Sequence, residues 1–283
     1  MFRRGGRLRA VRSGTARAAL DLALQDPVTN ALGGARLQET VRSAALAQEF
    51  SLVGEDRRPE GVLWHGVNLS PMSASEDALD EFGTHMAGRP RRASSVVGER
   101  AAIERLWQSL SEAWAPTVRE YRWSQPLLLA APPAQMPALP GTGLRAAEVQ
   151  EAAAVFPAAV AMFREEVGID PLLGDGGRSY RHRVGELIRQ RRTYVVVDRG
   201  AVVFKADVGA LFGPVAQIHG VWVRPDRRGH GLGRAAMTEL VDRVRRDHCP
   251  QVSLYVNDFN EPARRAYAAS GFAQVGELTT ILF

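Results

Sequence analysis

A turn with three glycines at alternate positions, Gly229, Gly231 and Gly233, is the stretch of this sequence best suited to chemistry. It follows an apolar run that ends at Val223, and a helical pattern begins directly after it. At such a strand–turn–helix junction the backbone N–H groups point outward, and the start of the helix carries partial positive charge. Glycine leaves room for an anion to approach the backbone closely. The turn therefore predicts a cradle for a phosphate group.

The residues around the turn distinguish between phosphate-binding motifs. A dinucleotide-binding turn has the pattern Gly-x-Gly-x-x-Gly, which begins at Gly229 and Gly231 but fails at Arg234. A P-loop requires Gly-Lys followed by Ser or Thr, and this turn contains no lysine. The turn instead has the pattern Arg/Gln-x-x-Gly-x-Gly/Ala, with Arg228, Gly231 and Gly233 in the three defined positions.

This pattern resembles the pyrophosphate loop of the GCN5-related N-acetyltransferase (GNAT) superfamily, whose members bind acetyl-CoA. The spacing from Val223 to Arg228, with Pro225 between them, is similar to the end of that family's fourth strand where it enters the loop. A second stretch resembles the family's other cofactor motif, with Asn260, Ala263, Tyr267, Gly271 and Phe272 at its spacing. The three pieces occur in the family's order.

The resemblance implies that acetyl-CoA is the co-substrate and that no metal takes part. Backbone N–H groups from Arg228 to Arg234 would hold the pyrophosphate, and the backbone of Val221 and Val223 would pair with the pantetheine arm as an added strand. His230 is expected to fill a variable loop position. The cofactor-binding residues implied in this way are Val221, Trp222, Val223, Arg228, Gly229, His230, Gly231, Leu232, Gly233, Arg234, Asn260, Ala263 and Tyr267.

Direct transfer of acetyl from CoA to an amine requires three things of a protein. The amine must lose a proton, the thioester oxygen must be stabilised and the departing thiolate must be protonated. Tyr267 lies seven residues after Asn260, which is two helical turns on the same face. The resemblance implies that its phenol is the general acid. The alternatives are a core tyrosine and a tyrosine that only positions the cofactor.

His219 is the first candidate for the catalytic base, nine residues before Arg228 on the strand that enters the cradle. A neutral imidazole near pH 7 can take a proton directly or through a water. Strand alternation predicts that Gln217, His219, Val221 and Val223 face one side, with Ile218 and Trp222 on the other. The alternatives are Asp207 on the preceding strand as the base, and a His219 that is a polar strand residue without a role.

Composition limits the class of protein. The chain has 283 residues and a formal net charge of +5, which suits one large or two small globular domains. Its acidic residues are interspersed with the arginines, so nucleic acid is not expected as the main partner. Cys249 is the only cysteine, which excludes an internal disulfide and a clustered-cysteine zinc site and suits the cytoplasm. No apolar run reaches membrane-spanning length, and Asp21 interrupts the N-terminal Ala/Leu stretch, so neither a membrane span nor a signal peptide is expected.

Apolar periodicity and turn residues predict the elements that carry these residues. Helices are expected at 15–24, 28–47 (broken near Gly33 and Gly34), 75–86, 100–114, 148–167 (bent at Pro157), 180–190, after the cradle and at 261–270. Strands are expected at 8–11, 50–54, 61–69, 94–97, 119–130, 144–147, 193–197, 201–211, 215–223 and 252–256, with one or two closing strands in 273–283. Four prolines between 131 and 143 indicate a linker.

The order of elements after the linker is that of the GNAT fold, and the first half shows a similar order without an Arg-x-x-Gly-x-Gly turn. We therefore expect an α/β fold with a mixed, mostly antiparallel sheet flanked by helices, in two tandem copies. Residues 1–130 would be a degenerate GNAT-like domain, 131–143 the linker and 144–283 the catalytic domain. This arrangement resembles actinobacterial tandem acetyltransferases with an uncharacterised N-terminal domain.

The expected activity is N-acetylation of a primary amine on a small molecule, an amino acid or a protein. The alternative is a non-catalytic acyl-CoA-binding or regulatory module that keeps the cradle without turnover. Neither the acceptor nor the oligomeric state follows from the sequence.

Overall fold

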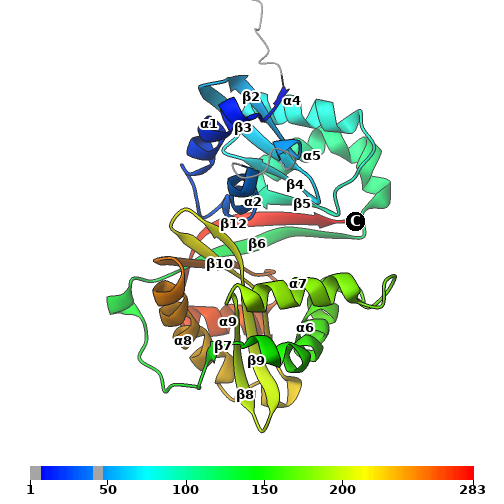
Figure 1. The fold of residues 1–283 in the computed structure, drawn as a ribbon. Coiled ribbons are helices and arrows are strands. Elements are labelled where there is room, and N and C mark those ends of the chain that lie inside the picture. Colours follow the sequence, from blue (N-terminus) through cyan, green and yellow to red (C-terminus); the bar gives the residue numbers. More distant parts are fainter. Residues whose placement is uncertain (1–7, 41–46) are drawn as a thin grey trace, which may run out of the picture. The chain divides into compact units, whose positions relative to one another are not determined.

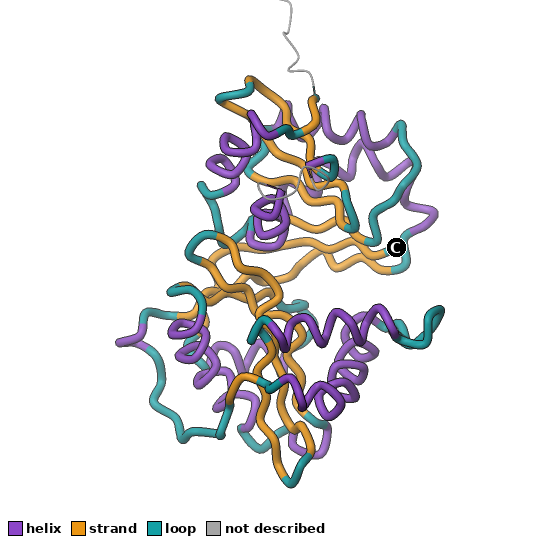
Figure 2. Tube along the Cα trace, viewed as in Figure 1, coloured by secondary structure: helices purple, strands orange, loops and turns teal. Residues whose placement is uncertain are grey.

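The computed structural model describes residues 8–40 and 47–283, which fall into two compact units (Figure 1). The first unit contains the chain up to Leu127 together with Tyr255–Asp258 and Gln274–Phe283. The second unit contains Leu128–Leu254 and Phe259–Ala273. The segment expected as a linker is drawn mostly as loop in Figure 2, with one short 3-10 helix at Pro133–Gln135. Gln274–Phe283 thus belongs to the first unit although it follows the second in sequence.

The first unit alternates strands and helices in the order expected from the sequence. Its strands run in the order β1-β2-β3-β4-β5-β12-β6, and all the pairings given for it are antiparallel except β4 with β5. Its elements are β1 (Arg9–Ala10), α1 (Ser13–Ala23), α2 (Ala31–Thr40), β2 (Phe50–Glu55), β3 (Arg58–His65), β4 (Asn68–Met72), α4 (Glu76–Ala87), β5 (Ser95–Glu99), α5 (Arg100–Trp114), β6 (Glu120–Ala130) and the end of β12 (Phe272–Leu282).

The core of this unit forms where α5 packs on the sheet. The apolar face of this helix is buried, with Ile103, Leu106 and Leu110 fully covered and Trp107 nearly so. The last strand completes this core, because Leu278–Leu282 pair with Ser95–Glu99 and Ile281 is buried in the same cluster. The C-terminal strand is therefore a structural part of the first unit.

Two sequence predictions in this unit are wrong. Helix α2 continues through Gly33 and Gly34 rather than breaking there, because the absence of a side chain at Gly33 lets Met72 pack against the helix backbone. The expected continuous strand at 61–69 is two strands, β3 and β4, which pair with each other across a turn at Gly66 and Val67. The part of the expected 28–47 helix at 41–46 lies outside the described residues.

The second unit carries the glycine-rich turn. Its strands run in the order β11-β10-β9-β8-β7, antiparallel except for β10 with β11. Its elements are β7 (Arg145–Ala146), α6 (Ala152–Val167, preceded by a 3-10 turn at Val149–Glu151), α7 (Arg178–Arg189), β8 (Thr193–Asp198), β9 (Ala201–Phe212), β10 (Val215–Val223), α8 (Leu232–Asp247), β11 (Gln251–Tyr255), α9 (Glu261–Ala269) and the start of β12.

Helices lie on both faces of the β8–β10 strands, with α6 and α7 on one side and α8 on the other (Figure 1). The buried cluster beneath α6 and α7 includes Val195, Val202 and Trp222, so the Trp222 side chain is part of the core. Helix α8 buries Ala236, Leu240 and Val244, whereas Leu232 at its start is only half-buried. The closing segment forms one long strand, β12.

The expected fold class is confirmed. Both units combine a mostly antiparallel sheet with flanking helices. The second follows the strand and helix order anticipated from the sequence, and the first does so except that one expected strand is the pair β3 and β4. Within the described residues, no helix is both long and apolar enough to cross a bilayer.

Candidate functional site

Strand β10 changes its pairing half-way along its length. Val215–Ile218 pair in parallel with Gln251–Leu254 of β11, and β10 then continues to Val223 beyond that pairing. On its other edge the register with β9 shifts between His219, opposite Asp207, and Trp222, opposite Lys205. This shift is a β-bulge.

The bulge corrects the side-chain alternation expected for this strand. Lys205 and Asp207 face the same side of β9, because their side chains are bonded to each other. Side chains of paired residues lie on the same face of a sheet, so His219 and Trp222 also share a side rather than opposing one another. The extra residue in the bulge resets the period of two, which a sequence pattern alone does not reveal.

The glycine-rich turn presents an open helix start. Gly229 and Gly231 have φ angles of +79° and +82°, which L side chains adopt only with strain. Within the described structure, a Cβ built at either glycine has no atom within 4 Å. The first helical hydrogen bond is donated by Ala235 to the Gly231 carbonyl (3.0 Å), so the N–H groups of the preceding residues come before the helical ladder.

The start of α8 also lacks the groups that usually satisfy its N–H donors. In the described part of the chain, no side chain caps α8, and its first turn contains no acidic residue. Arg234 adds a positive charge there. Gly233 differs from the other two glycines because it allows close packing of the helix start on β10. A Cβ at this position would lie 3.3 Å from Val223 Cγ2. The helix start is therefore open to an anion.

The Arg228 side chain anchors the loop. Its Nε donates to the Val223 carbonyl (2.9 Å) and its Nη2 to Glu165 Oε2 (2.6 Å). The other oxygen of Glu165 accepts from Trp222 Nε1 (3.1 Å). Glu165 on α6 thus joins the end of β10 to the first residue of the loop. No sequence motif indicates Glu165, because it lies 63 positions before its partner Arg228.

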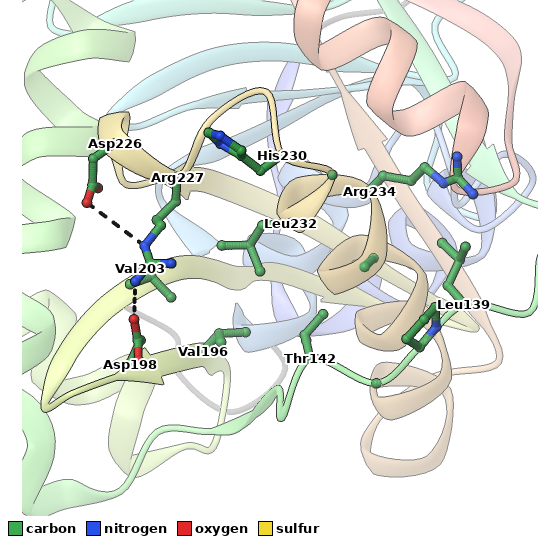
Figure 3. A pocket seen from close by; sticks show the side chains of 14 residues that line it. Leu139, Thr142, Val196, Asp198, Val203, Asp226, Arg227, His230, Leu232 and Arg234 are labelled. Atoms are coloured by element: carbon green, nitrogen blue, oxygen red, sulfur yellow. Dashed lines mark hydrogen bonds and ion pairs between the residues drawn. The ribbon is translucent and has the colours of Figure 1, made fainter.

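A pocket of about 800 Å³ adjoins the cradle (Figure 3). Val196 and Val203 form its floor from β8 and β9, and the 139–142 segment lies at its edge. Arg227 is bonded there to Asp198 and faces Asp226 at 3.9 Å. The cradle contributes His230, Gly231, Leu232 and Arg234 to the lining. The side chain of His230 is exposed, as expected for a variable loop position.

Helix α9 is tied to the cradle. Asn260 caps it, with Oδ1 accepting from the Ala263 N–H at 3.3 Å. At the other end, the buried Ser270 hydroxyl lies 2.7 Å from the Ala266 carbonyl of its own helix and 3.0 Å from the Arg234 carbonyl in the first turn of α8. This hydroxyl places the end of the helix that carries Tyr267 beside the start of α8, and the sequence motifs did not include it.

Tyr267 is buried, with 8% of its surface exposed, and its ring lies against Phe272. Burial raises the pKa of its phenol above the ordinary value, and the Glu166 carboxylate on α6 adds to the effect. Tyr267 is therefore protonated at neutral pH and lies within electrostatic reach of α6. Its burial is compatible with both the acid role and the core role considered above.

His219 is held in a neutral form. Burial lowers its pKa to about 4, and the positive charges of Arg183 and Lys205 act in the same direction. Nε2 lies 2.9 Å from the Gln217 side-chain oxygen, which makes this nitrogen the N–H donor and leaves Nδ1 as the acceptor. Nδ1 faces the backbone of Gly209, where a methyl group would overlap it.

Asp207, the alternative base, is engaged on both oxygens. Oδ1 accepts from Thr193 Oγ1 (2.8 Å), and Oδ2 is paired with the ammonium of Lys205. All three side chains are buried. Because both oxygens serve a buried cation and a hydroxyl, this carboxylate is committed to structure and is not the first choice for removing a proton.

Comparison with known proteins now identifies the second unit. Residues 178–272 match the model of the acetyltransferase (GNAT) family. These residues belong to the GNAT family. The match covers the cradle, β10 and α9, which confirms the resemblance found in the sequence. Residues 49–155 match a domain of unknown function, DUF4081.

Curated relatives match only part of this chain. The mycothiol acetyltransferase of Thermobispora bispora is 39% identical over 62 residues, covering 22% of this chain and 21% of that protein. The mycothiol acetyltransferase of Thermobifida fusca is 35% identical over 89 residues, covering 28% of each chain. The alignments thus span between a fifth and a third of the length of these relatives.

Solved GNAT structures share the fold along nearly the whole chain. A GNAT-family acetyltransferase from Colwellia psychrerythraea aligns with a TM-score of 0.61 and 14% identity, covering 98% of this chain and 99% of that one. A tandem GNAT protein from the clavulanic acid biosynthesis pathway aligns with a TM-score of 0.54 and 14% identity, covering 97% of both. At such identities the likeness is one of fold, and it supports the tandem GNAT architecture.

Proposed function

We propose that the second unit, which contains most of residues 144–283, is an N-acetyltransferase that transfers acetyl from acetyl-CoA to a primary amine by direct attack. In this proposal residues 1–130 are a degenerate GNAT-like domain that does not bind the co-substrate, and 131–143 link the two. The observation that carries the proposal is the start of α8, which is uncapped in the described structure and follows two glycines with positive φ and open space.

The chain's own groups fit acetyl-CoA at this place. The N–H groups between Arg228 and Arg234 would hold the pyrophosphate, helped by the partial charge of the helix start. The backbone of Val221 and Val223, which lies past the β11 pairing, would bind the pantetheine arm. Acetyl-CoA supplies the activated thioester, and the protein supplies orientation and proton transfer.

Two side chains have proposed roles in proton transfer. Tyr267 keeps its proton at neutral pH and would donate it to the CoA thiolate. His219 is unprotonated at neutral pH, since its pKa is about 4, and would accept the amine proton directly or through a water. Attack on the thioester makes the amine nitrogen cationic and more acidic, so a weak base suffices at that stage.

Calorimetric titration with acetyl-CoA tests the proposal, using the wild type and Gly231→Arg. The wild type should bind one equivalent and the variant none, because the arginine side chain occupies the open space of the cradle. Two equivalents for the wild type would show that the first unit also binds and that it is not degenerate. Absence of binding to the wild type refutes the acetyltransferase proposal.

A non-catalytic acyl-CoA-binding or regulatory module is the second candidate. It is favoured by the surroundings of His219, where one ring nitrogen is bonded to Gln217 and the other faces Gly209. Release of CoA thiol, measured with a panel of amines, separates the two. Under the module hypothesis acetyl-CoA binds and no amine promotes thiol release.

The acceptor is proposed only as a class. The matched relatives are named as mycothiol acetyltransferases, so the acceptor of those enzymes should be tested first. Small amines, amino acids and the lysines or N-termini of proteins complete the panel. The proposed compartment is the cytoplasm, where acetyl-CoA is available.

A further inference from the structure

Lys205 stands apart from the other basic residues of the chain. The sequence has 36 lysines and arginines together, and Lys205 is the only lysine among them. It is also buried, with 1% of its surface exposed, in the middle of β9. Burying a cation is costly unless it is paired and hydrogen-bonded, so the position calls for an explanation.

The ammonium of Lys205 joins three strands. It is paired with Asp207 on its own strand, and Asp207 in turn accepts from Thr193 on β8 at 2.8 Å. Towards β10 the ammonium donates to the Gly220 carbonyl at 3.4 Å. The cluster of Thr193, Asp207 and Lys205 therefore ends on the bulge of β10.

Gly220 is the residue of this bulge with a left-handed backbone, which glycine adopts without strain. Its φ is +56°, and a Cβ there would lie 2.8 Å from Met162 Cε and 3.3 Å from Lys205 Nζ. The peptide that joins Gly220 to Val221 is planar and trans, so its carbonyl and its N–H point in opposite directions. Because the Lys205 ammonium donates to the Gly220 carbonyl, the Val221 N–H points away from the ammonium.

Lysine suits this position better than arginine. The ammonium is a compact charge that meets a carboxylate oxygen and a carbonyl at one point, whereas a guanidinium spreads five donors in a fork. The site offers Asp207 and Gly220 as acceptors, and an arginine buried here would leave donors unsatisfied. In a chain that otherwise uses arginine, this geometry accounts for the exception.

We propose that Lys205 is a positioning residue that holds the Gly220–Val221 peptide so that the Val221 N–H is presented to the thioester oxygen of acetyl-CoA. The inference rests on the proposed function, in which Val221 borders the pantetheine arm. Lys205 acts through the backbone and does not touch the reacting atoms. Asp207 holds the ammonium in place, which gives the buried carboxylate a purpose other than that of a base.

The test uses a paired substitution. Lys205→Met alone leaves the Asp207 carboxylate buried without its cation and is expected to misfold. Replacing both partners by apolar residues, Lys205→Met with Asp207→Leu, removes the pair while filling the space. The matched control is Tyr194→Phe with Asp247→Asn, which removes another polar contact of the second unit (2.7 Å) without touching β10.

The measurement is the infrared carbonyl stretch of acetyl-CoA carrying ¹³C at the thioester carbon, bound to each protein. A hydrogen bond to the thioester oxygen lowers this frequency. The wild type and the control should show the lowered frequency. The double variant should show the frequency of free acetyl-CoA while its calorimetric dissociation constant changes little, since the cradle is intact. With any amine that supports turnover, its kcat should fall about 10²–10³-fold with KM for acetyl-CoA unchanged.

The outcomes separate this inference from the proposed function. A lowered frequency in the double variant equal to that of the wild type overturns the positioning role and leaves the acetyltransferase proposal standing. An unshifted frequency in a wild type that binds acetyl-CoA also overturns it. A wild type that does not bind acetyl-CoA overturns both.

Discussion

Replacing Gly231 by alanine separates the two reasons for a glycine at the start of α8. The φ of +82° costs an L residue about 1–2 kcal/mol in stability. The added methyl group meets no described atom within 4 Å in the free protein, so strain should be the whole effect on folding. In the bound state the same methyl group would stand where the phosphates approach the backbone.

The expected loss of affinity follows from the hydrogen bonds at risk. A bond between a backbone N–H and a charged phosphate oxygen contributes about 1.5–3 kcal/mol. Loss of one such bond should raise the dissociation constant for acetyl-CoA about 10–150-fold. Calorimetric titration measures this constant, and chemical denaturation measures the free energy of unfolding.

Gly200→Ala is the matched control for this experiment. Gly200 lies in the β8–β9 hairpin with a φ of +78°, and a Cβ there also meets no described atom within 4 Å. The two variants should lose the same stability, about 1–2 kcal/mol. Only Gly231→Ala should lose affinity. Equal dissociation constants for the two variants would refute the cradle as the phosphate site.

Three further predictions concern single side chains. The pKa of His219 in the folded protein is about 4, below its ordinary value of 6.5. Between these two pH values the unfolded state binds a proton that the folded state does not. The free energy of unfolding should therefore fall by up to about 3 kcal/mol as the pH drops from 6.5 to 4. His219→Asn should remove that part of the pH dependence in denaturation curves, and an inflection of kcat/KM near pH 6.5 that depends on His219 would contradict the low pKa. Tyr267→Phe should lower kcat about 10²–10⁴-fold with acetyl-CoA affinity retained, and an unchanged kcat would leave Tyr267 only a structural role. Ile281→Ala should destabilise the first unit by about 2–5 kcal/mol in denaturation, and a smaller loss would argue against the C-terminal strand as part of that core.

The parts of the site that the sequence predicted are those fixed by neighbouring residues. The helix that starts directly after the glycine-rich turn and the bounds of α5 depend on spacings within about two helical turns, and the structure has them as expected. Local preference and fold agree at these places. Elements set by such short spacings therefore lie where the sequence predicts them.

The parts that the sequence did not predict depend on contacts between distant residues. In the bulge of β10, Gly220 lies against Lys205 and Met162. The alternation of side chains within the strand does not indicate the extra residue. The Glu165 contact with Arg228 and the pairing of the C-terminal strand with β5 likewise join segments far apart in the chain. Such pairs are decided by the packing of the whole unit, so they become visible only in three dimensions.

The start of α4 in the first unit differs from the start of α8 in the groups that surround it. Helix α4 follows β4 as α8 follows β10, but the Ser75 hydroxyl caps it by accepting from the Ala78 N–H at 3.2 Å. Glu76 and Asp77 then occupy the first turn, where their charges favour the helix start and repel an anion. Because these groups already satisfy the N–H donors and the partial charge at the start of α4, a phosphate would not be bound favourably there.

The strand before α4 also differs from β10 in a way that disfavours an added strand. Pro71 in β4 has no N–H to offer an added strand, and its ring lies 3.5 Å from where a Cβ at Gly98 of β5 would stand. The helix end and the strand edge are the two places where acetyl-CoA would bind in the second unit. Both are closed in the first, and each closure uses ordinary side chains that stabilise the fold. These two features support the proposal that the first unit does not bind the co-substrate, because neither a free helix start nor a free N–H at Pro71 is present there.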